Sequence, residues 1–168
     1  LAGLMTKVTD RFELTVDRLA YGGNGVARRE DGYVVFVAGA VPGDRIVGIL
    51  NPGQGITIYP IHAEALKAFD EEPERWIDVT WDIDEDNAQR FPAKIAVTAL
   101  NEPGSLAQVA AVIGEADGNI DNIKMMKQVP DYAEMVIDLE VWDLTHLNEI
   151  LAGLRAKDVV SSATRVGG

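Results

Sequence analysis

The stretch Asn101-Glu-Pro-Gly-Ser-Leu106 decides how the second half of this chain folds. It follows an alternating apolar run, Lys94 to Leu100, and it opens an amphipathic run that begins at Leu106. Pro103 and Gly104 end the first run, because proline lacks a backbone N–H and glycine accepts turn conformations. The sequence therefore predicts a strand, a short turn and a helix in succession.

The predicted helix has a recognisable start and one apolar side. Ser105 is expected to be its N-cap, with Gln108 as the capping-box partner three residues later. The helix should end near Asp117 and Gly118. Its apolar stripe is formed by residues three or four apart, namely Leu106, Val109, Ala110 and Ile113.

The segments that follow complete a known order of elements. Asn119–Met126 and Ala133–Val141 are predicted strands, Asp143 is a predicted cap for a second helix, and Val159–Val166 is a closing strand. The order strand, helix, strand, strand, helix, strand is that of the α+β ferredoxin-like fold, in which two helices cover one face of a four-stranded antiparallel sheet. The predicted inward residues are Met135, Ile137, Leu139 and Val141 of the third strand and Leu147, Ile150, Leu151 and Leu154 of the second helix.

The first part of the chain differs in character. Short alternating runs such as Phe12–Val16 and Tyr33–Val37 are separated by glycine-rich turns, a pattern typical of a small, mostly β, barrel-like domain. We expect this domain to span residues 1–62, a connector with a short helix and a strand to span residues 63–92, and the ferredoxin-like domain to span residues 93–168.

Composition narrows the classes of function. Residues 1–50 hold six Lys/Arg and six Asp/Glu, so the remaining nine and 21 of the totals of 15 and 27, and the whole net charge of −12, fall in residues 51–168. The negative charge of residues 51–168 should repel the phosphate backbones of nucleic acids. The chain has no cysteine, no apolar run of membrane-spanning length and no secretory signal, so we expect a cytoplasmic protein without disulfides. Because it starts with Leu1, we also expect a piece of a longer protein.

Neither catalysis nor metal binding is indicated. The only histidines are His62 and His146, and His146 is predicted to be a surface or first-turn residue of the second helix. The acidic run Asp82–Asp86 lacks the ordered ligand spacing of a calcium loop. Acid–base chemistry needs convergent titratable groups, so no catalytic residue, metal or cofactor is expected.

Ala99–Val109 followed by Asn119–Ile123 resembles an ACT domain. That resemblance implies an amino-acid effector, with valine, isoleucine or leucine favoured, bound where two copies of the domain meet in a homodimer. The implied ligand-binding residues come from the turn and from the start of the second strand: Asn101, Glu102, Pro103, Gly104, Ser105, Leu106, Asn119, Ile120 and Asn122. The alternative is that Pro103 and Gly104 only make a turn.

Residues 40–168 are similar to the C-terminal regulatory region of the RelA/SpoT-homologue family of alarmone, (p)ppGpp, synthetase/hydrolases. The resemblance implies a non-catalytic regulatory region whose enzyme domains are absent from this chain. Residues 8–50, through Leu19–Arg28 and Val41–Asp44, also resemble a TRAM domain, a small RNA-binding barrel. This second resemblance implies RNA-facing side chains at Tyr21, Arg28, Arg29 and Arg45.

Two other readings stay open at this point. In one, the chain is an RNA-binding module whose barrel contacts tRNA or rRNA while the ACT domain provides dimerisation. In the other, both parts are assembly elements only, and the arginines are solvated hairpin residues.

Overall fold

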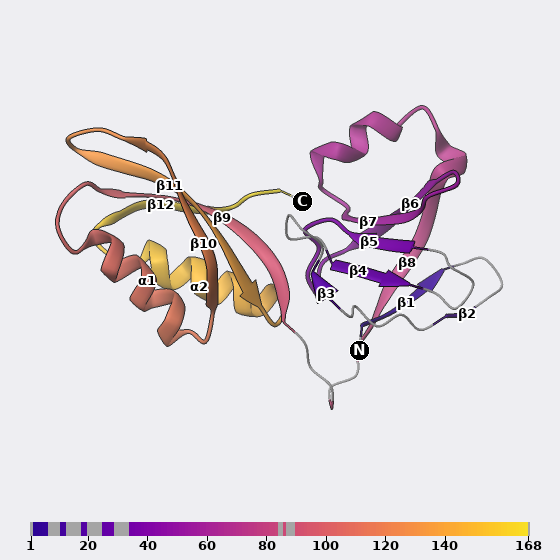
Figure 1. The fold of residues 1–168 in the computed structure, drawn as a ribbon, viewed down its shortest axis with the longest axis horizontal. Helices are drawn as coiled ribbons and strands as arrows, with labels where there is room; N and C mark the ends of the chain where they lie inside the picture. The colour runs from indigo at the N-terminus through magenta and orange to yellow at the C-terminus, as the bar shows by residue number, and fades with distance from the viewer. Residues whose placement is uncertain are drawn as a thin grey trace. The chain divides into compact units, whose positions relative to one another are not determined.

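The computed structural model describes the backbone of residues 2–6, 11–12, 18–19, 25–28, 34–83, 86 and 90–167, and the side chains of residues 34–81, 86 and 90–167. The chain divides into two compact units, which meet in sequence between Pro92 and Ala93 (Figure 1). We call residues 1–92 unit 1 and residues 93–166 unit 2. Among the described residues, no helix is long and apolar enough to cross a membrane.

Unit 1 is mostly β, as predicted. Within the described residues its strands form one sheet in the order β2-β1-β8-β6-β7-β5-β4-β3. All neighbouring pairs are antiparallel except β5 and β7, which are parallel. The bounds of the strands are β1 Ala2–Thr6, β2 Arg11–Phe12, β3 Arg18–Leu19, β4 Gly25–Arg28, β5 Val34–Val37, β6 Ile46–Asn51, β7 Gly55–Pro60 and β8 Trp76–Ile83.

The segment expected to be a connector belongs to the body of unit 1. It contains the 3-10 helices η1 (Glu64–Phe69) and η2 (Pro73–Arg75) and then β8, which pairs with both β6 and β1. The reason lies in the alternation of β8, whose residues Ile77, Val79 and Trp81 all pack on the core beside β5 and β7. A strand with one apolar face must cover it, so this segment joins the sheet.

One glycine is required by the path of β7. Gly55 has φ of +126°, and a Cβ placed on it would overlap the carbonyl of Val34 on the neighbouring strand β5. Only glycine combines this backbone conformation with such a close approach of two strands.

Unit 2 has the predicted α+β order. Its sheet runs β10-β11-β9-β12, and both helices lie on one face of it (Figure 1). The bounds are β9 Phe91–Leu100, α1 Ser105–Glu115, β10 Asn119–Gln128, β11 Tyr132–Val141, α2 Leu144–Arg155 and β12 Val160–Arg165.

The core of unit 2 confirms most of the predicted inward residues. All four of β11 and all four of α2 are buried. Of the predicted apolar stripe of α1, Val109 and Ile113 are buried and Ala110 is half-buried, but the Leu106 side chain is 45% exposed and does not join the core. Val112 is buried instead, and it faces α2 where Gly153 allows close approach: a Cβ on Gly153 would lie 3.1 Å from Val112. The buried stripe of α1 is thus rotated away from Leu106.

Candidate functional site

The turn between β9 and α1 presents the start of a helix. Gly104 is the N-cap, with a φ of +89°, and its carbonyl accepts the N–H of Gln108 at 3.0 Å. The N–H of Ser105 is used by the carbonyl of Glu102 at 3.2 Å. The N–H groups of Leu106 and Ala107 are therefore donors that the helix itself does not use. Together with the helix dipole they favour an anionic group, such as a carboxylate.

The predicted capping box is wrong. Ser105 lies inside the first turn rather than at the N-cap, and no side chain caps α1. Ser105 is 4% exposed, and its Oγ is buried without a hydrogen-bond partner among the described residues. Gly104 takes the cap position because a left-handed residue lets the chain turn sharply into the helix after Pro103.

Asn101 makes contacts that the sequence did not indicate. Its Nδ2 donates to the carbonyl of Val129 at 2.6 Å, and its Oδ1 accepts from Nε2 of Gln128 at 3.1 Å. Its backbone N–H donates to the carbonyl of Asp131 at 3.1 Å. Asn101 therefore fastens the β9–α1 turn to the tip of the β10–β11 hairpin.

The other predicted half of the site lies at the start of β10. Nδ2 of Asn119 donates to Glu140 at 3.2 Å, and Nδ2 of Asn122 donates to Asp138 at 3.4 Å. Ile120 is half-buried, opposite the buried Leu139 of β11. The two amides and two carboxylates thus form a polar array across two neighbouring strands.

Asp121 adds a third carboxylate beside this array. It sits at a register shift between Ile120 and Asn122, where the pairing of β10 with β11 is irregular. Partial burial raises the pKa of Asp121, and the nearby carboxylates of Glu140 and Asp138 raise it further. Nζ of Lys94 lies 3.6 Å from Oδ1 of Asp138, so this lysine pairs with a carboxylate other than that of Asp121.

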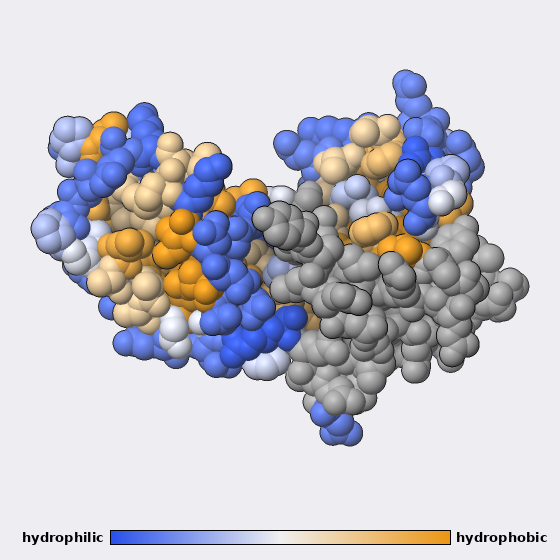
Figure 2. Space-filling view, viewed as in Figure 1, coloured by the Kyte–Doolittle hydropathy of each residue, from blue (hydrophilic) through white to orange (hydrophobic). Residues whose placement is uncertain are grey.

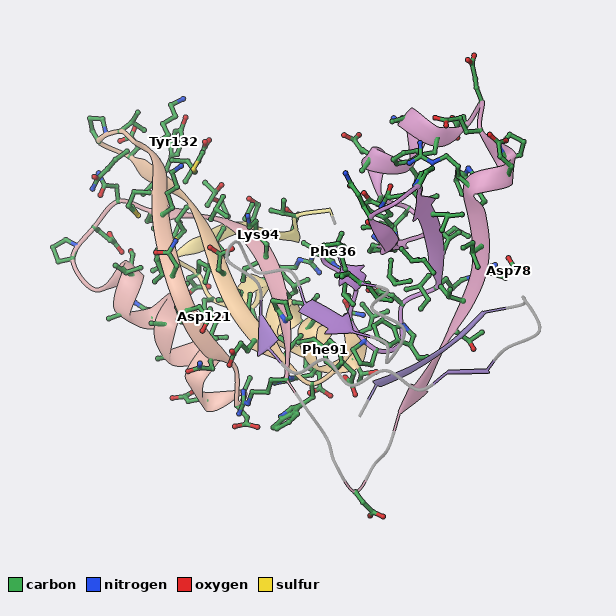
Figure 3. All side chains as sticks on the ribbon, turned by 45° about the vertical axis from the view of Figure 1, so that its right-hand side comes forward. Phe36, Asp78, Phe91, Lys94, Asp121 and Tyr132 are labelled. Carbon is green, nitrogen blue, oxygen red and sulfur yellow. The ribbon has the colours of Figure 1, made fainter. Side chains whose placement is uncertain are left out.

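The two halves do not meet within one chain. The turn at residues 101–105 precedes α1, whereas residues 119–122 follow it, and an eleven-residue helix is about 16 Å long. The hydrogen bonds agree, since the turn contacts the hairpin tip at 128–131 while Asn119 and Asn122 contact the far end of β11. Figure 3 shows Tyr132 and Asp121 at opposite ends of the hairpin. In one copy of unit 2, the two groups of predicted ligand-binding residues, called half-sites below, therefore lie apart.

Three large apolar side chains of α1 and β10 are exposed. Leu106, Met125 and Met126 are 45%, 43% and 56% exposed. In Figure 2, apolar residues gather on the face of unit 2 where α1 and β10 lie. No charged residue occurs in α1 before Glu115, so the exposed side of this helix lacks the charges that normally keep a helix face in water.

The two histidines are not part of a shared site. His62 is exposed in unit 1, whereas His146, predicted as a surface or first-turn residue, is a buried first-turn residue of α2. Nδ1 of His146 accepts the N–H of Trp142 at 3.0 Å, and its Nε2 lies 2.6 Å from the carbonyl oxygen of Ala116. A carbonyl only accepts, so Nε2 carries the proton and the ring joins two loops. Within the described residues, no group of three or more His, Cys, Asp or Glu side chains could hold a metal ion.

The predicted RNA-facing residues are not brought together by the described structure. Arg45 is exposed just before β6, and Arg28 ends β4 with its side chain outside the described residues. Tyr21 and Arg29 also lie outside the described residues. RNA binding through these four residues, and the TRAM resemblance behind it, stay predictions.

Two family models match the chain. Residues 26–82 match the RelA/SpoT RIS domain, and residues 87–165 match the ACT domain. The first match covers most of the described part of unit 1, and the second covers unit 2 almost completely.

Named relatives agree with these matches. The chain is 60% identical over 130 residues to the GTP pyrophosphokinase rsh of Brucella ovis, which is 77% of this chain and 17% of that protein. It is 30% identical over 125 residues to the bifunctional (p)ppGpp synthase/hydrolase SpoT of Escherichia coli K12, which is 74% of this chain and 18% of that protein. The matched region is thus less than a fifth of the length of either relative.

Among solved structures, the chain also matches the ACT domain from the GTP pyrophosphokinase of Chlorobium tepidum, at 22% identity with a TM-score of 0.42, covering 46% of this chain and all of that chain. From the family models and the named relatives, the chain belongs to the RelA/SpoT family as a C-terminal regulatory region, in which a RIS domain precedes an ACT domain.

Proposed function

We propose that unit 2 binds a branched-chain amino acid between two copies of this chain, and that binding regulates a (p)ppGpp synthetase/hydrolase. The observation that carries the proposal is the separation of the two half-sites to the two ends of α1 and β10. If two β10 strands pair antiparallel, edge to edge, the turn of one copy comes to the start of β10 in the other. Two identical sites then form, as a two-fold interface requires.

The edge of the sheet supports this mode of association. β10 is an edge strand of ten residues, whereas β12 on the opposite edge has six. A long edge strand exposes unpaired N–H and C=O groups that another strand can satisfy. The exposed Met125 and Met126 and the uncharged start of α1 would also be buried by such pairing.

The chemistry of the half-sites suits a zwitterion. The N–H groups of Leu106 and Ala107 favour the carboxylate of the ligand. In the other copy, the carboxylate of Asp121 and the amide oxygen of Asn122 suit its ammonium group, and a cation there would relieve the repulsion among Asp121, Asp138 and Glu140. Leu106 and Ile120 supply apolar surface for a branched side chain. Glu102 and Pro103, also in the predicted set, would shape the turn.

Regulation requires that the amino acid bind two states with different affinity. A site that exists only when two ACT domains are paired meets this condition, because the ligand stabilises the paired state over the unpaired one. In a full-length synthetase/hydrolase, the ligand would thereby shift the balance between synthesis and hydrolysis of (p)ppGpp.

Calorimetric titration tests ligand binding directly. Valine, isoleucine and leucine are titrated into the chain at concentrations high enough for self-association, with D-valine as the control. We expect saturable heat for at least one L-amino acid, and loss of that heat in Leu106→Asp, which puts a negative charge beside the carboxylate-binding amides. No heat with any of the three would leave a scaffold role for unit 2.

Cross-linking tests the pairing of β10 edges. Because the chain has no native cysteine, any disulfide must join introduced thiols. Lys124→Cys places one thiol near the middle of β10, and Ser161→Cys places one on the exposed edge strand β12. We expect a disulfide-linked dimer from Lys124→Cys and much less from Ser161→Cys. The opposite result would rule out pairing through β10.

A further inference from the structure

We infer that Gln128 is a positioning residue of the amino-acid site: through Asn101 it sets the geometry of the turn, and it couples ligand binding to the tip of the β10–β11 hairpin. This inference rests on the proposed function. Gln128 would not contact the ligand, since it is the last residue of β10 and lies at the far end of that strand from Asn119–Asn122. Its only described side-chain hydrogen bond is to Asn101.

Chemistry fixes the orientation of the Asn101 amide. The carbonyl oxygen of Val129 can only accept, so the Asn101 atom 2.6 Å from it must be Nδ2. Oδ1 then faces Gln128, whose Nε2 must be the donor at 3.1 Å. Turning the amide over would set two oxygens against each other at Val129, so the two bonds lock one orientation.

The locked amide keeps capacity for a ligand. An asparagine amide has two N–H donors and an oxygen with two lone pairs. Val129 uses one donor and Gln128 uses one lone pair, which leaves one of each. The ammonium group of an amino acid can donate to the remaining lone pair without displacing Gln128. The Asn101–Gln128 hydrogen bond, which we call the latch, thus holds Oδ1 in a fixed direction and leaves it accessible.

The latch works with the backbone of the hairpin. The N–H of Asn101 donates to the carbonyl of Asp131, and the N–H of Val129 donates to the carbonyl of Tyr132 at 2.9 Å. The turn and the hairpin tip therefore move as one body while Asn101 is latched. Coupling between the two is reciprocal. A ligand bound at the turn should slow amide exchange at the hairpin tip, and a more mobile tip should lower the affinity for the ligand.

The test compares three variants with matched chemistry. Gln128→Glu keeps the shape and removes the donor to Oδ1. Gln128→Lys restores a donor of similar reach and serves as the rescue. Tyr132→Phe is the control, because it removes the bond from Nζ of Lys127 to the Tyr132 hydroxyl, 3.1 Å, on the same hairpin without touching Asn101. Affinity is measured by calorimetry, and amide hydrogen exchange is followed at Asn101, Val129 and the residues between them and α1.

We expect Gln128→Glu to lower the affinity for the amino acid about three- to tenfold, as the loss of one polar contact predicts. The affinity should recover in Gln128→Lys and stay unchanged in Tyr132→Phe. We also expect the ligand to slow exchange at Val129 in the wild type and in Tyr132→Phe, but not in Gln128→Glu. A purely structural role would speed exchange without changing affinity or the ligand's effect at Val129, and that result would overturn the inference.

The outcomes separate this inference from the proposed function. If no amino acid binds the wild type, the proposed function fails. The role of Gln128 in ligand binding then fails with it, since faster exchange at the turn in Gln128→Glu than in Tyr132→Phe would show only a structural hydrogen bond. If the amino acid binds equally well to all the variants, the site stands and the role of Gln128 fails alone.

Discussion

At the scale of single residues, Ser105 is a buried hydroxyl without a partner. A buried polar group that makes no hydrogen bond costs about 1–3 kcal/mol, and Oγ of Ser105 has no partner among the described residues. We expect Ser105→Ala to raise the free energy of unfolding of unit 2 by about 1 kcal/mol, measured by denaturant titration. Ser162→Ala, at an exposed position of β12, is the control and should change little. A marked loss of stability in Ser105→Ala would mean that the hydroxyl has a partner.

Asp121 gives a prediction about pH. Its pKa is raised above its ordinary value near 3.8, first by burial and then by Glu140 and Asp138. The folded state therefore binds the proton more tightly than the unfolded chain, so stability falls as pH rises through the raised pKa. We expect Asp121→Asn to melt higher than the wild type at pH 7, with the difference disappearing below about pH 3.8.

Thermal melting across this pH range checks the prediction for Asp121. Asp158→Asn, an exposed position outside the acidic array, controls for the loss of one negative charge. A lower melting temperature for Asp121→Asn at neutral pH would show that the ionised carboxylate has a favourable partner.

At the scale of elements, Arg75 joins η2 to the end of β6. Its Nε donates to the carbonyl of Leu50 and its Nη2 to Oδ1 of Asn51, both at 2.9 Å, while Nη1 lies 3.1 Å from Glu72. The guanidinium also lies 4.6 Å from the ring centre of Phe69. We expect Arg75→Ala to destabilise unit 1 by about 2–3 kcal/mol, and Arg75→Lys to recover little, because an ammonium cannot reproduce the fork.

Hydrogen exchange at the end of β6 measures this effect within unit 1. The matched control is Lys67→Ala, which breaks the Lys67–Glu64 pair at 3.9 Å, where both side chains are largely exposed. Exposed pairs contribute little, so exchange should not change. Equal effects of the two substitutions would contradict the structural role of Arg75.

The elements that local patterns predict are those with one continuous apolar face. β11 and α2 match the prediction residue by residue, since Met135 to Val141 alternate and Leu147 to Leu154 follow the helical period. The Asp143 cap was also predictable, and its Oδ1 accepts the N–H of His146 at 2.8 Å. Leu106 and Ser105 were misplaced because the start of α1 depends on the backbone conformation of Gly104, which shifts the helix by one residue.

Contacts between distant residues could not be read from the sequence. Asn101 reaches Gln128 and Val129, which are 27 and 28 positions away, and nothing local marks those two as its partners. The same holds for the parallel pairing of β5 with β7 and for the place of β8 between β1 and β6. The residue types of the candidate site were predictable from the ACT resemblance, but their division into two half-sites needed the length and direction of α1.

At the scale of the whole molecule, the proposed amino-acid site is formed by two chains together. In the proposed dimer, each copy of unit 2 would contribute a turn to one site and the start of β10 to the other. A single copy would then have no complete site, and affinity for the amino acid would depend on protein concentration. In the relatives, the ligand would change the enzymatic activity only by changing how their regulatory regions pair.

Mixing two defective variants tests this claim most directly. Leu106→Asp spoils the turn and Asn122→Arg spoils the start of β10, both at exposed positions that the fold tolerates. Neither variant alone should bind the amino acid in calorimetry. After equal mixing and exchange of subunits, random pairing makes about half of the dimers mixed. In a mixed dimer one site is built from the intact turn of one chain and the intact start of β10 of the other, while the second site is doubly defective. Binding should therefore return at about a quarter of the wild-type number of sites. If the mixture binds nothing although mixed dimers form, no site is shared between two chains, which contradicts the proposed function.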